Sequence, residues 1–147
     1  MSFCKSLEGV NDTGLLKKIL EFKGIEAGIE FILKHIQGAY SLTILTQDAM
    51  YLVRDPMGFK PLCFARVGET WYASSESIAL PKANKTNVAP GSAYRIDRHG
   101  VRQILDLPAE HKSICSFEFV YFMYSANYNI QHFVNLDFNI VTCWFKG

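Results

Sequence analysis

Four cysteines are the first side chains in this sequence that could do chemistry, because a thiolate can act as a nucleophile or a metal ligand. They lie far apart and never as Cys-x-x-Cys, at Cys4, Cys63, Cys115 and Cys143. This spacing argues against a disulfide framework or a self-contained zinc site, so we expect a reducing, cytoplasmic setting. Cys63 stands within Leu-Cys-Phe, where a small buried apolar residue is expected.

An arginine–aspartate pair opens a second candidate segment, RDPMGFKPL, which begins at Arg54 and Asp55. Its two prolines fix φ, and Gly58 permits a backbone angle that a Cβ resists, so the segment predicts a stiff turn between two strands. A carboxylate beside a guanidinium in such a turn usually forms an ion pair or a hydrogen-bond network. We therefore interpret Arg54, Asp55 and Gly58 as framework and not as reacting groups.

Hydroxyl groups gather in a third segment, Ser74-Ser75-Glu76-Ser77. No Gly-x-Ser-x-Gly elbow surrounds these serines, which argues against a serine nucleophile. Glu76 is expected to begin a helix after a capping serine.

Two helices are expected ahead of these segments. Asn11-Asp12-Thr13 supplies N-cap chemistry for a short helix that Gly24 ends. Apolar residues from Ile25 to Ile36 then recur at helical spacing and predict a second helix. His35 is expected to interact with the C-terminal dipole of that helix and to have no catalytic role.

After Gly38 the pattern changes to strands. Three hairpins are expected, followed by one long aromatic strand: Tyr40–Thr46 with Met50–Val53, Leu62–Val67 with Glu69–Ala73, Ser92–Asp97 with Val101–Leu105, and then Ser116–Tyr124. His99 falls in the third hairpin turn and is expected to be exposed to solvent. Two helices followed by mostly antiparallel strands predict an α+β layered domain.

Bulk properties restrict the function classes. A chain of 147 residues, with 49% hydrophobic and 20% charged residues, suits one globular domain with a real core. The net charge of +1, with both signs scattered, predicts neither a nucleic-acid partner nor a membrane partner. No apolar run is long enough to span a bilayer, and residues 1–10 do not resemble a signal peptide.

The order of the motifs resembles the amidophosphoribosyltransferase family, the glutamine-dependent first enzymes of purine synthesis. GAYSLTILT, RDPMGFKPL, ASSESIAL, PGSAYRIDRHGV and CSFEFVYF follow one another here as they do in that family, over roughly residues 11–122. The resemblance implies part of the Ntn-hydrolase architecture, a sandwich of mostly antiparallel sheets between helical layers (αββα). It also implies that Arg54, Asp55 and Gly58 are framework next to a glutamine site.

The family releases ammonia from glutamine with an N-terminal cysteine, whose thiolate forms a glutamyl thioester. It then transfers the ammonia to phosphoribosyl pyrophosphate, giving phosphoribosylamine. The family's segments with the nucleophile and the oxyanion hole precede the point where Asn11 aligns, and Cys4 has no family motif around it. We therefore expect no catalytic residue in this chain, which we interpret as a truncated, inactive copy. We interpret Cys4 as an incidental thiol.

Two residues match functional positions of the family. Asp12 aligns with an aspartate that pairs with the α-amino group of glutamine, although Asp12 could also simply cap the following helix. Cys115 aligns with a cysteine that binds a four-iron cluster in some members, which needs about four thiolates. The other cluster ligands have no counterpart here, so no metal is expected at Cys115. No cofactor is expected for this chain, whereas the family uses Mg²⁺ and, in some members, the cluster.

Past Phe122 the resemblance stops. We therefore assign residues 1–122 to a partial type 2 glutamine amidotransferase domain and residues 123–147 to a divergent aromatic tail, with no phosphoribosyltransferase domain. Such a charge-poor tail is an exposed strand-forming liability or non-homologous sequence joined to a broken copy, or it folds back as a last strand.

Two other interpretations stay open. One is a fragment of an asparagine-synthetase-like glutaminase domain, which carries a similar Arg-Asp…Gly…Lys-Pro-Leu block. The other is a non-catalytic interaction protein, either a homo-oligomer or a partner of a full-length enzyme through exposed strand edges.

Overall fold

The computed structural model describes residues 11–107 and 143–146, the last four by their backbone alone. The chain divides into two compact units, Met1–Gln37 and Gly38–Gly147. The described residues form two α-helices, eight strands and one short 3₁₀ helix. The α+β class predicted from the sequence is confirmed. No helix in the described part of the chain is long and apolar enough to cross a membrane.

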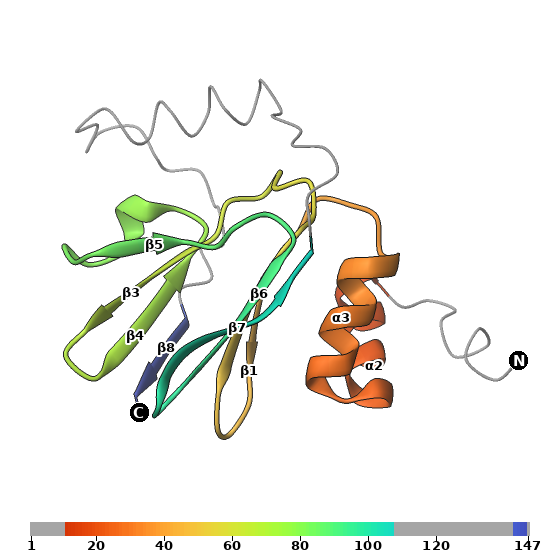
Figure 1. Ribbon diagram of the computed structural model, residues 1–147, viewed down its shortest axis with the longest axis horizontal. Coiled ribbons are helices and arrows are strands. Elements are labelled where there is room, and N and C mark those ends of the chain that lie inside the picture. The colour runs from red at the N-terminus through yellow and green to blue at the C-terminus, as the bar shows by residue number, and fades with distance from the viewer. Residues whose placement is uncertain (1–10, 108–142, 147) are drawn as a thin grey trace, which may run out of the picture. The chain divides into compact units, whose positions relative to one another are not determined.

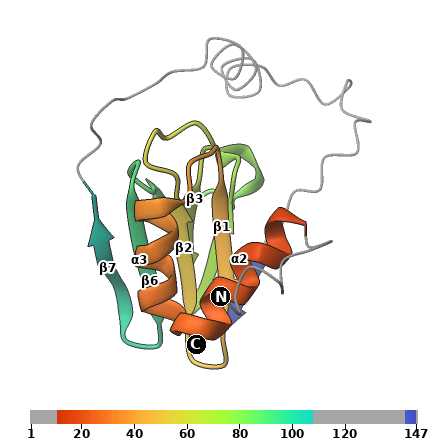
Figure 2. The same ribbon diagram turned by 90° about the vertical axis from the view of Figure 1, so that its right-hand side faces the viewer.

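The first unit contains helix α2 (Asp12–Lys23) and helix α3 (Ile25–His35), as the sequence predicts (Figure 2). Gly24 joins them with a φ of +82°, a backbone angle that glycine adopts without strain. The apolar stripes are buried at Ile19, Ile29, Ile32 and Leu33. Gly28 lets the helices approach closely, because a Cβ there would lie 3.0 Å from the Cα of Leu20.

His35 lies at the end of α3, where the sequence places it. Its ring packs on Phe31 with the two ring centroids 4.5 Å apart. The Lys23 ammonium lies over the same Phe31 ring, 4.5 Å from its centroid. These contacts make His35 part of an aromatic and cationic cluster at the helix end.

The second unit contains two four-stranded antiparallel sheets, which lie face to face (Figure 1). The first sheet has the order β1-β2-β6-β7, with β1 Ser41–Leu45, β2 Met50–Arg54, β6 Ser92–Asp97 and β7 Gly100–Asp106. The second has the order β5-β3-β4-β8, with β5 Lys85–Asn87, β3 Cys63–Val67, β4 Thr70–Ser74 and β8 Cys143–Lys146. All three predicted hairpins are present, namely β1–β2, β3–β4 and β6–β7.

The core of this unit lies between its two sheets. It contains Met50, Leu52 and Ile96 of the first sheet and Phe64 and Ala73 of the second, together with the neighbouring Leu62 and Val88. The Phe64 ring packs against Trp71 of its own sheet and Tyr94 of the opposite one, at centroid distances of 6.2 and 5.7 Å. Aromatic contacts at these distances add to the hydrophobic burial that joins the sheets.

Two further strands, β5 and β8, were not among the predicted hairpins. Strand β5 pairs with β3, although its three residues are all exposed and show no apolar alternation. Strand β8 pairs with β4, so for Cys143–Lys146 the alternative that the tail folds back as a last strand is confirmed. The predicted aromatic strand Ser116–Tyr124 lies outside the described residues.

Candidate functional site

The framework predicted around Arg54 is a hydrogen-bond network built on main-chain carbonyls. Arg54 is the last residue of β2, and its guanidinium donates from all three nitrogens. Nε donates to the Lys60 carbonyl at 2.9 Å, Nη1 to the Val88 carbonyl at 2.8 Å and Nη2 to the Gly58 carbonyl at 2.9 Å. A planar guanidinium suits this task because its donors are fixed in a fork. One side chain therefore joins the loop 55–62 to residue 88.

Asp55 completes this network from within the loop and is fully buried. Its carboxylate accepts the backbone N–H of Phe59 at 3.0 Å and that of Lys60 at 3.1 Å. Its own carbonyl accepts the N–H groups of Gly58 and Gly91, both at 3.0 Å. A buried carboxylate is tolerated because charge-assisted hydrogen bonds replace its water. Arg54 and Asp55 therefore each form hydrogen bonds with main-chain groups of this turn.

Gly58 is required at its position for two reasons. Its φ is +70°, in the left-handed region that favours glycine. A Cβ at Gly58 would also lie 2.6 Å from Cγ of Pro90, which is closer than van der Waals contact allows. The loop 55–62 therefore packs directly on the loop 88–91. The Val88 N–H, which donates to the Leu62 carbonyl at 2.9 Å, adds a further link between the two loops.

Tyr40 is a neighbour of Asp55 that the sequence did not single out. The Tyr40 carbonyl accepts the Asp55 N–H at 3.0 Å. Burial, and next the negative charge of Asp55, raise the pKa of the Tyr40 phenol to about 12. The phenol therefore stays protonated at neutral pH and is a hydrogen-bonding group there, not a base.

Asp12, the predicted glutamine contact, lies in the first turn of α2 and is exposed. The alternative that Asp12 caps this helix is wrong, because the cap is Asn11, whose side-chain oxygen accepts the Gly14 N–H at 2.8 Å. Among the residues that the structure describes, the Asp12 carboxylate has no hydrogen bond or ion pair. The structure thus brings Arg54, Asp55 and Gly58 together in the second unit, while Asp12 belongs to the first.

Cys63 is the one thiol whose side chain the structure describes, and it is buried. Its Sγ donates to the Ser74 carbonyl at 3.2 Å. Burial raises the pKa of the Cys63 thiol, only partly opposed by the charges of Lys85 and Arg54, so the reactive thiolate is disfavoured. The prediction of a buried structural cysteine is confirmed. Cys4 and Cys115 lie outside the described residues.

The serine segment differs from the prediction that Glu76 begins a helix after a capping serine. Glu76 is the N-cap residue of a 3₁₀ helix, and no side chain caps that helix. The Ser74 hydroxyl accepts the N–H of Glu76 at 3.1 Å, and the 3₁₀ helix Ser77–Ala79 follows. Ser74 itself is buried, and its carbonyl accepts from Cys63.

Metal binding finds no support in the described ranges. No group of three or more His, Cys, Asp or Glu side chains gathers in residues 11–107 in a way that could hold an ion.

Comparison with known proteins identifies the family. The sequence profile described as "Glutamine amidotransferase domain" matches residues 5–82, which is more than half of the 147-residue chain. The chain belongs to the glutamine amidotransferase domain family. The matched range includes Asp12 and the Arg54–Asp55 pair, so both candidate regions lie inside this amidotransferase domain.

Its curated relatives include amidophosphoribosyltransferases. The enzyme of Methanothermobacter thermautotrophicus is 35% identical over 97 residues, which cover 64% of this chain and 20% of the relative. The enzyme of Archaeoglobus fulgidus is 32% identical over 120 residues, which cover 76% of this chain and 26% of the relative. The human enzyme is 35% identical over 118 residues, covering 65% and 23%. The predicted resemblance is confirmed, and the chain spans at most about a quarter of the length of these relatives.

Solved structures agree with the sequence comparison. The glutamine phosphoribosylpyrophosphate amidotransferase of B. subtilis, complexed with ADP and GMP, aligns with a TM-score of 0.66 at 27% identity, over 82% of this chain and 29% of that one. A second structure, of an allosteric regulatory enzyme of purine biosynthesis, aligns with a TM-score of 0.67 at 27% identity and the same coverage. The predicted Ntn-hydrolase type of amidotransferase fold is thereby confirmed.

Proposed function

We propose that this chain is the framework part of a glutamine amidotransferase domain of the amidophosphoribosyltransferase type, in which Asp12 contacts the α-amino group of glutamine. The intact relatives would supply ammonia from glutamine to phosphoribosyl pyrophosphate. The names of the curated relatives favour this type over an asparagine-synthetase-like enzyme. One observation supports the assignment of Asp12. Its carboxylate is exposed and forms no hydrogen bond with the described residues, while Asn11 caps the helix.

Asp12 has the negative charge that this contact needs, and it lies in the first turn of α2. A carboxylate in the first turn of a helix accepts a cationic amine while the helix N-terminus stabilises its negative charge. Asn11 orients the helix start, so binding of an amine at Asp12 does not compete with capping. The contact adds one charge-assisted hydrogen bond, which contributes roughly 1.5–3 kcal/mol in a protein.

The Asp12 contact is tested by calorimetric titration with two ligands. One is glutamine, and the other is glutaramate, which is glutamine without its α-amino group. Asp12→Asn is expected to weaken glutamine binding by about tenfold or more and to leave glutaramate binding unchanged. Asp48→Asn, in the exposed β1–β2 turn, is the matched control and is expected to change neither. Equal losses for both ligands in Asp12→Asn would rule the contact out.

We further propose that the 147-residue chain does not hydrolyse glutamine by itself. The support is Cys63, the described thiol, which is buried and is held in its neutral form. Incubation with glutamine is expected to release no glutamate above the buffer blank, with the intact human enzyme as the positive control. Steady glutamate release that is abolished by a thiol-alkylating reagent would overturn this proposal.

A further inference from the structure

A second polar site lies where the β3–β4 and β6–β7 turns meet, at one end of the two sheets. Residues from both turns line a pocket of about 100 Å³, namely Arg66, Glu69, Trp71, Asp97, Arg98 and Gly100. The Arg54–Asp55 network uses none of these side chains. The pocket therefore needs an explanation of its own.

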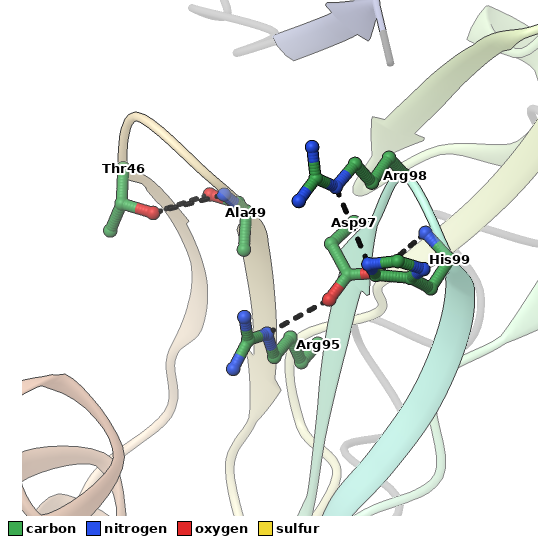
Figure 3. Close-up of polar contacts among 6 residues, drawn as sticks. All are labelled: Thr46, Ala49, Arg95, Asp97, Arg98 and His99. Carbon is green, nitrogen blue, oxygen red and sulfur yellow. Dashed lines mark hydrogen bonds and ion pairs between the residues drawn. The ribbon is translucent and has the colours of Figure 1, made fainter.

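Two arginines supply oriented donors to this pocket. The Nε of Arg66 donates to the Gly68 carbonyl at 2.9 Å, and its guanidinium lies over the Trp71 ring, 5.2 Å from the centroid. The Nε of Arg98 donates to Nε2 of His99 at 3.3 Å (Figure 3). Each guanidinium is thus tethered by one nitrogen, and its two terminal nitrogens have no partner within the described residues. Such terminal pairs suit a carboxylate.

The two acidic side chains of the pocket differ in how they are used. Asp97 is committed, since its Oδ1 accepts the His99 N–H at 2.8 Å and its Oδ2 lies 3.2 Å from Nε of Arg95 (Figure 3). Glu69 is exposed and makes no hydrogen bond or ion pair in the part of the chain that the structure describes. Glu69 is therefore the acceptor that remains for a cationic group.

Trp71 forms the apolar wall of the pocket. Its ring is half-buried and contacts Phe64 in the core, which fixes its position. The Arg66 guanidinium on one side of the ring adds a cation–π contact. A rigid aromatic wall beside a few convergent polar groups is the usual composition of a small-molecule site.

We propose that this pocket binds a small α-amino acid as its zwitterion. Its carboxylate would bind the terminal nitrogens of Arg66 and Arg98, its ammonium Glu69, and its aliphatic carbons the Trp71 face. Two cationic and two anionic side chains line the pocket, so a ligand with one charge of each sign is matched. A polyanion is repelled by Glu69 and Asp97, and a simple cation by the arginines. The pocket volume admits only a small ligand.

The test uses Trp71 as the reporter. The chain has two tryptophans, so Trp144→Phe leaves Trp71 as the single tryptophan fluorophore. Titration with glycine is expected to change the emission saturably. Acetate and methylammonium each keep only one of the two charges. Each is expected to bind at least about tenfold more weakly than glycine, because it loses one charge-assisted contact. Isothermal titration calorimetry on the unsubstituted protein repeats the comparison without any substitution.

Substitutions separate the two contacts. Arg98→Gln is expected to weaken the binding of glycine and acetate alike. Glu69→Gln is expected to weaken glycine binding and to leave acetate bound at least as tightly, because it removes a negative charge. Lys82→Gln, an exposed cation that does not line the pocket, is the control and is expected to change nothing. The proposal is overturned if glycine gives no saturable signal by either method. It is also overturned if acetate binds as tightly as glycine, or if Lys82→Gln weakens glycine binding as much as Arg98→Gln does.

Discussion

Two regions of the sheet unit use their charged side chains differently. Around the loop 55–62, the side chains of Arg54 and Asp55 form hydrogen bonds with main-chain groups, and Asp55 is fully buried. At the β3–β4 and β6–β7 turns, Arg66, Glu69 and Arg98 are exposed and each keeps unused donors or acceptors. Charged residues in the first region hold the backbone in place, whereas those in the second remain available to a ligand. Residue type alone does not separate these two roles.

The largest expected effect comes from Asp55→Ala, which tests the buried side of this comparison. The substitution leaves the N–H groups of Phe59 and Lys60 without their acceptor, and each unmet donor costs about 1–3 kcal/mol. We expect the free energy of unfolding to fall by about 3–5 kcal/mol in a urea titration. Asp48→Ala, at an exposed turn, is expected to change it by less than about 0.5 kcal/mol. Similar losses in the two variants would remove the distinction between the regions.

A smaller effect is expected from Gly58→Ala. Gly58 and Gly68 both have positive φ, +70° and +61°, but only Gly58 has a neighbour that a Cβ would strike. Gly68→Ala therefore measures the backbone strain alone, about 1–2 kcal/mol. Gly58→Ala is expected to lower the free energy of unfolding by roughly 1–3 kcal/mol more than Gly68→Ala does, because Pro90 must also shift.

Pro90→Ala provides the check on that explanation, since it removes the Cγ atom that would lie 2.6 Å from a Cβ at residue 58. The double variant Gly58→Ala/Pro90→Ala is expected to recover part of the extra loss in a double-mutant cycle. Strictly additive effects would mean that the close approach does not limit residue 58.

Alkaline pH is expected to affect the same region through Tyr40. The pKa of its phenol is raised from 10.0 to about 12, so the folded protein keeps the proton where the unfolded chain loses it. This contribution to stability is fully present below pH 10 and is lost as pH rises through about 12. Tyr40→Phe is expected to show a shallower decline of the urea midpoint over that window. Parallel declines in the two proteins would contradict the assignment.

The smallest effect is expected at the exposed turns, from Asp97→Asn. The His99 N–H, and next the nearby positive charges of Arg95, His99 and Arg102, lower the pKa of the Asp97 carboxyl. Its contribution is therefore present above the ordinary aspartate range near pH ~4 and is lost as pH falls through the lowered folded value. Asp97→Asn is expected to flatten the acid limb of the stability profile slightly. Asp48→Asn is the control that is expected to leave that limb unchanged.

Much of this fold could be predicted because the periodic segments are strong. The apolar stripes of both helices and the turn residues between the paired strand segments carry their own signal. Strand β5 was missed because Lys85, Thr86 and Asn87 are exposed and bury nothing that would leave a pattern. The link between Arg54 and Val88 was also missed, since it joins residues 34 positions apart and is directed to a carbonyl that every residue has.

The candidate site could be predicted less completely than the fold. The structural role of Arg54 and Asp55 followed from turn chemistry, but their acceptors and donors did not. The role of Asp12 came from the resemblance to a family, and only the structure showed that Asn11 does the capping. Tyr40 left no signal, because the effect of Asp55 on its phenol depends on a contact between segments that the sequence separates.

The three carbonyls held by the Arg54 guanidinium also restrict where the chain can change in length. The carbonyls of residues 58 and 60 must each lie within hydrogen-bond distance of the Arg54 guanidinium. An insertion or deletion between residues 54 and 60 would therefore break at least one of these hydrogen bonds. Residues 81–84, which connect the 3₁₀ helix to β5, make no bond to this guanidinium. Length variation between members of the family is therefore expected to accumulate there and to spare the segment that follows β2.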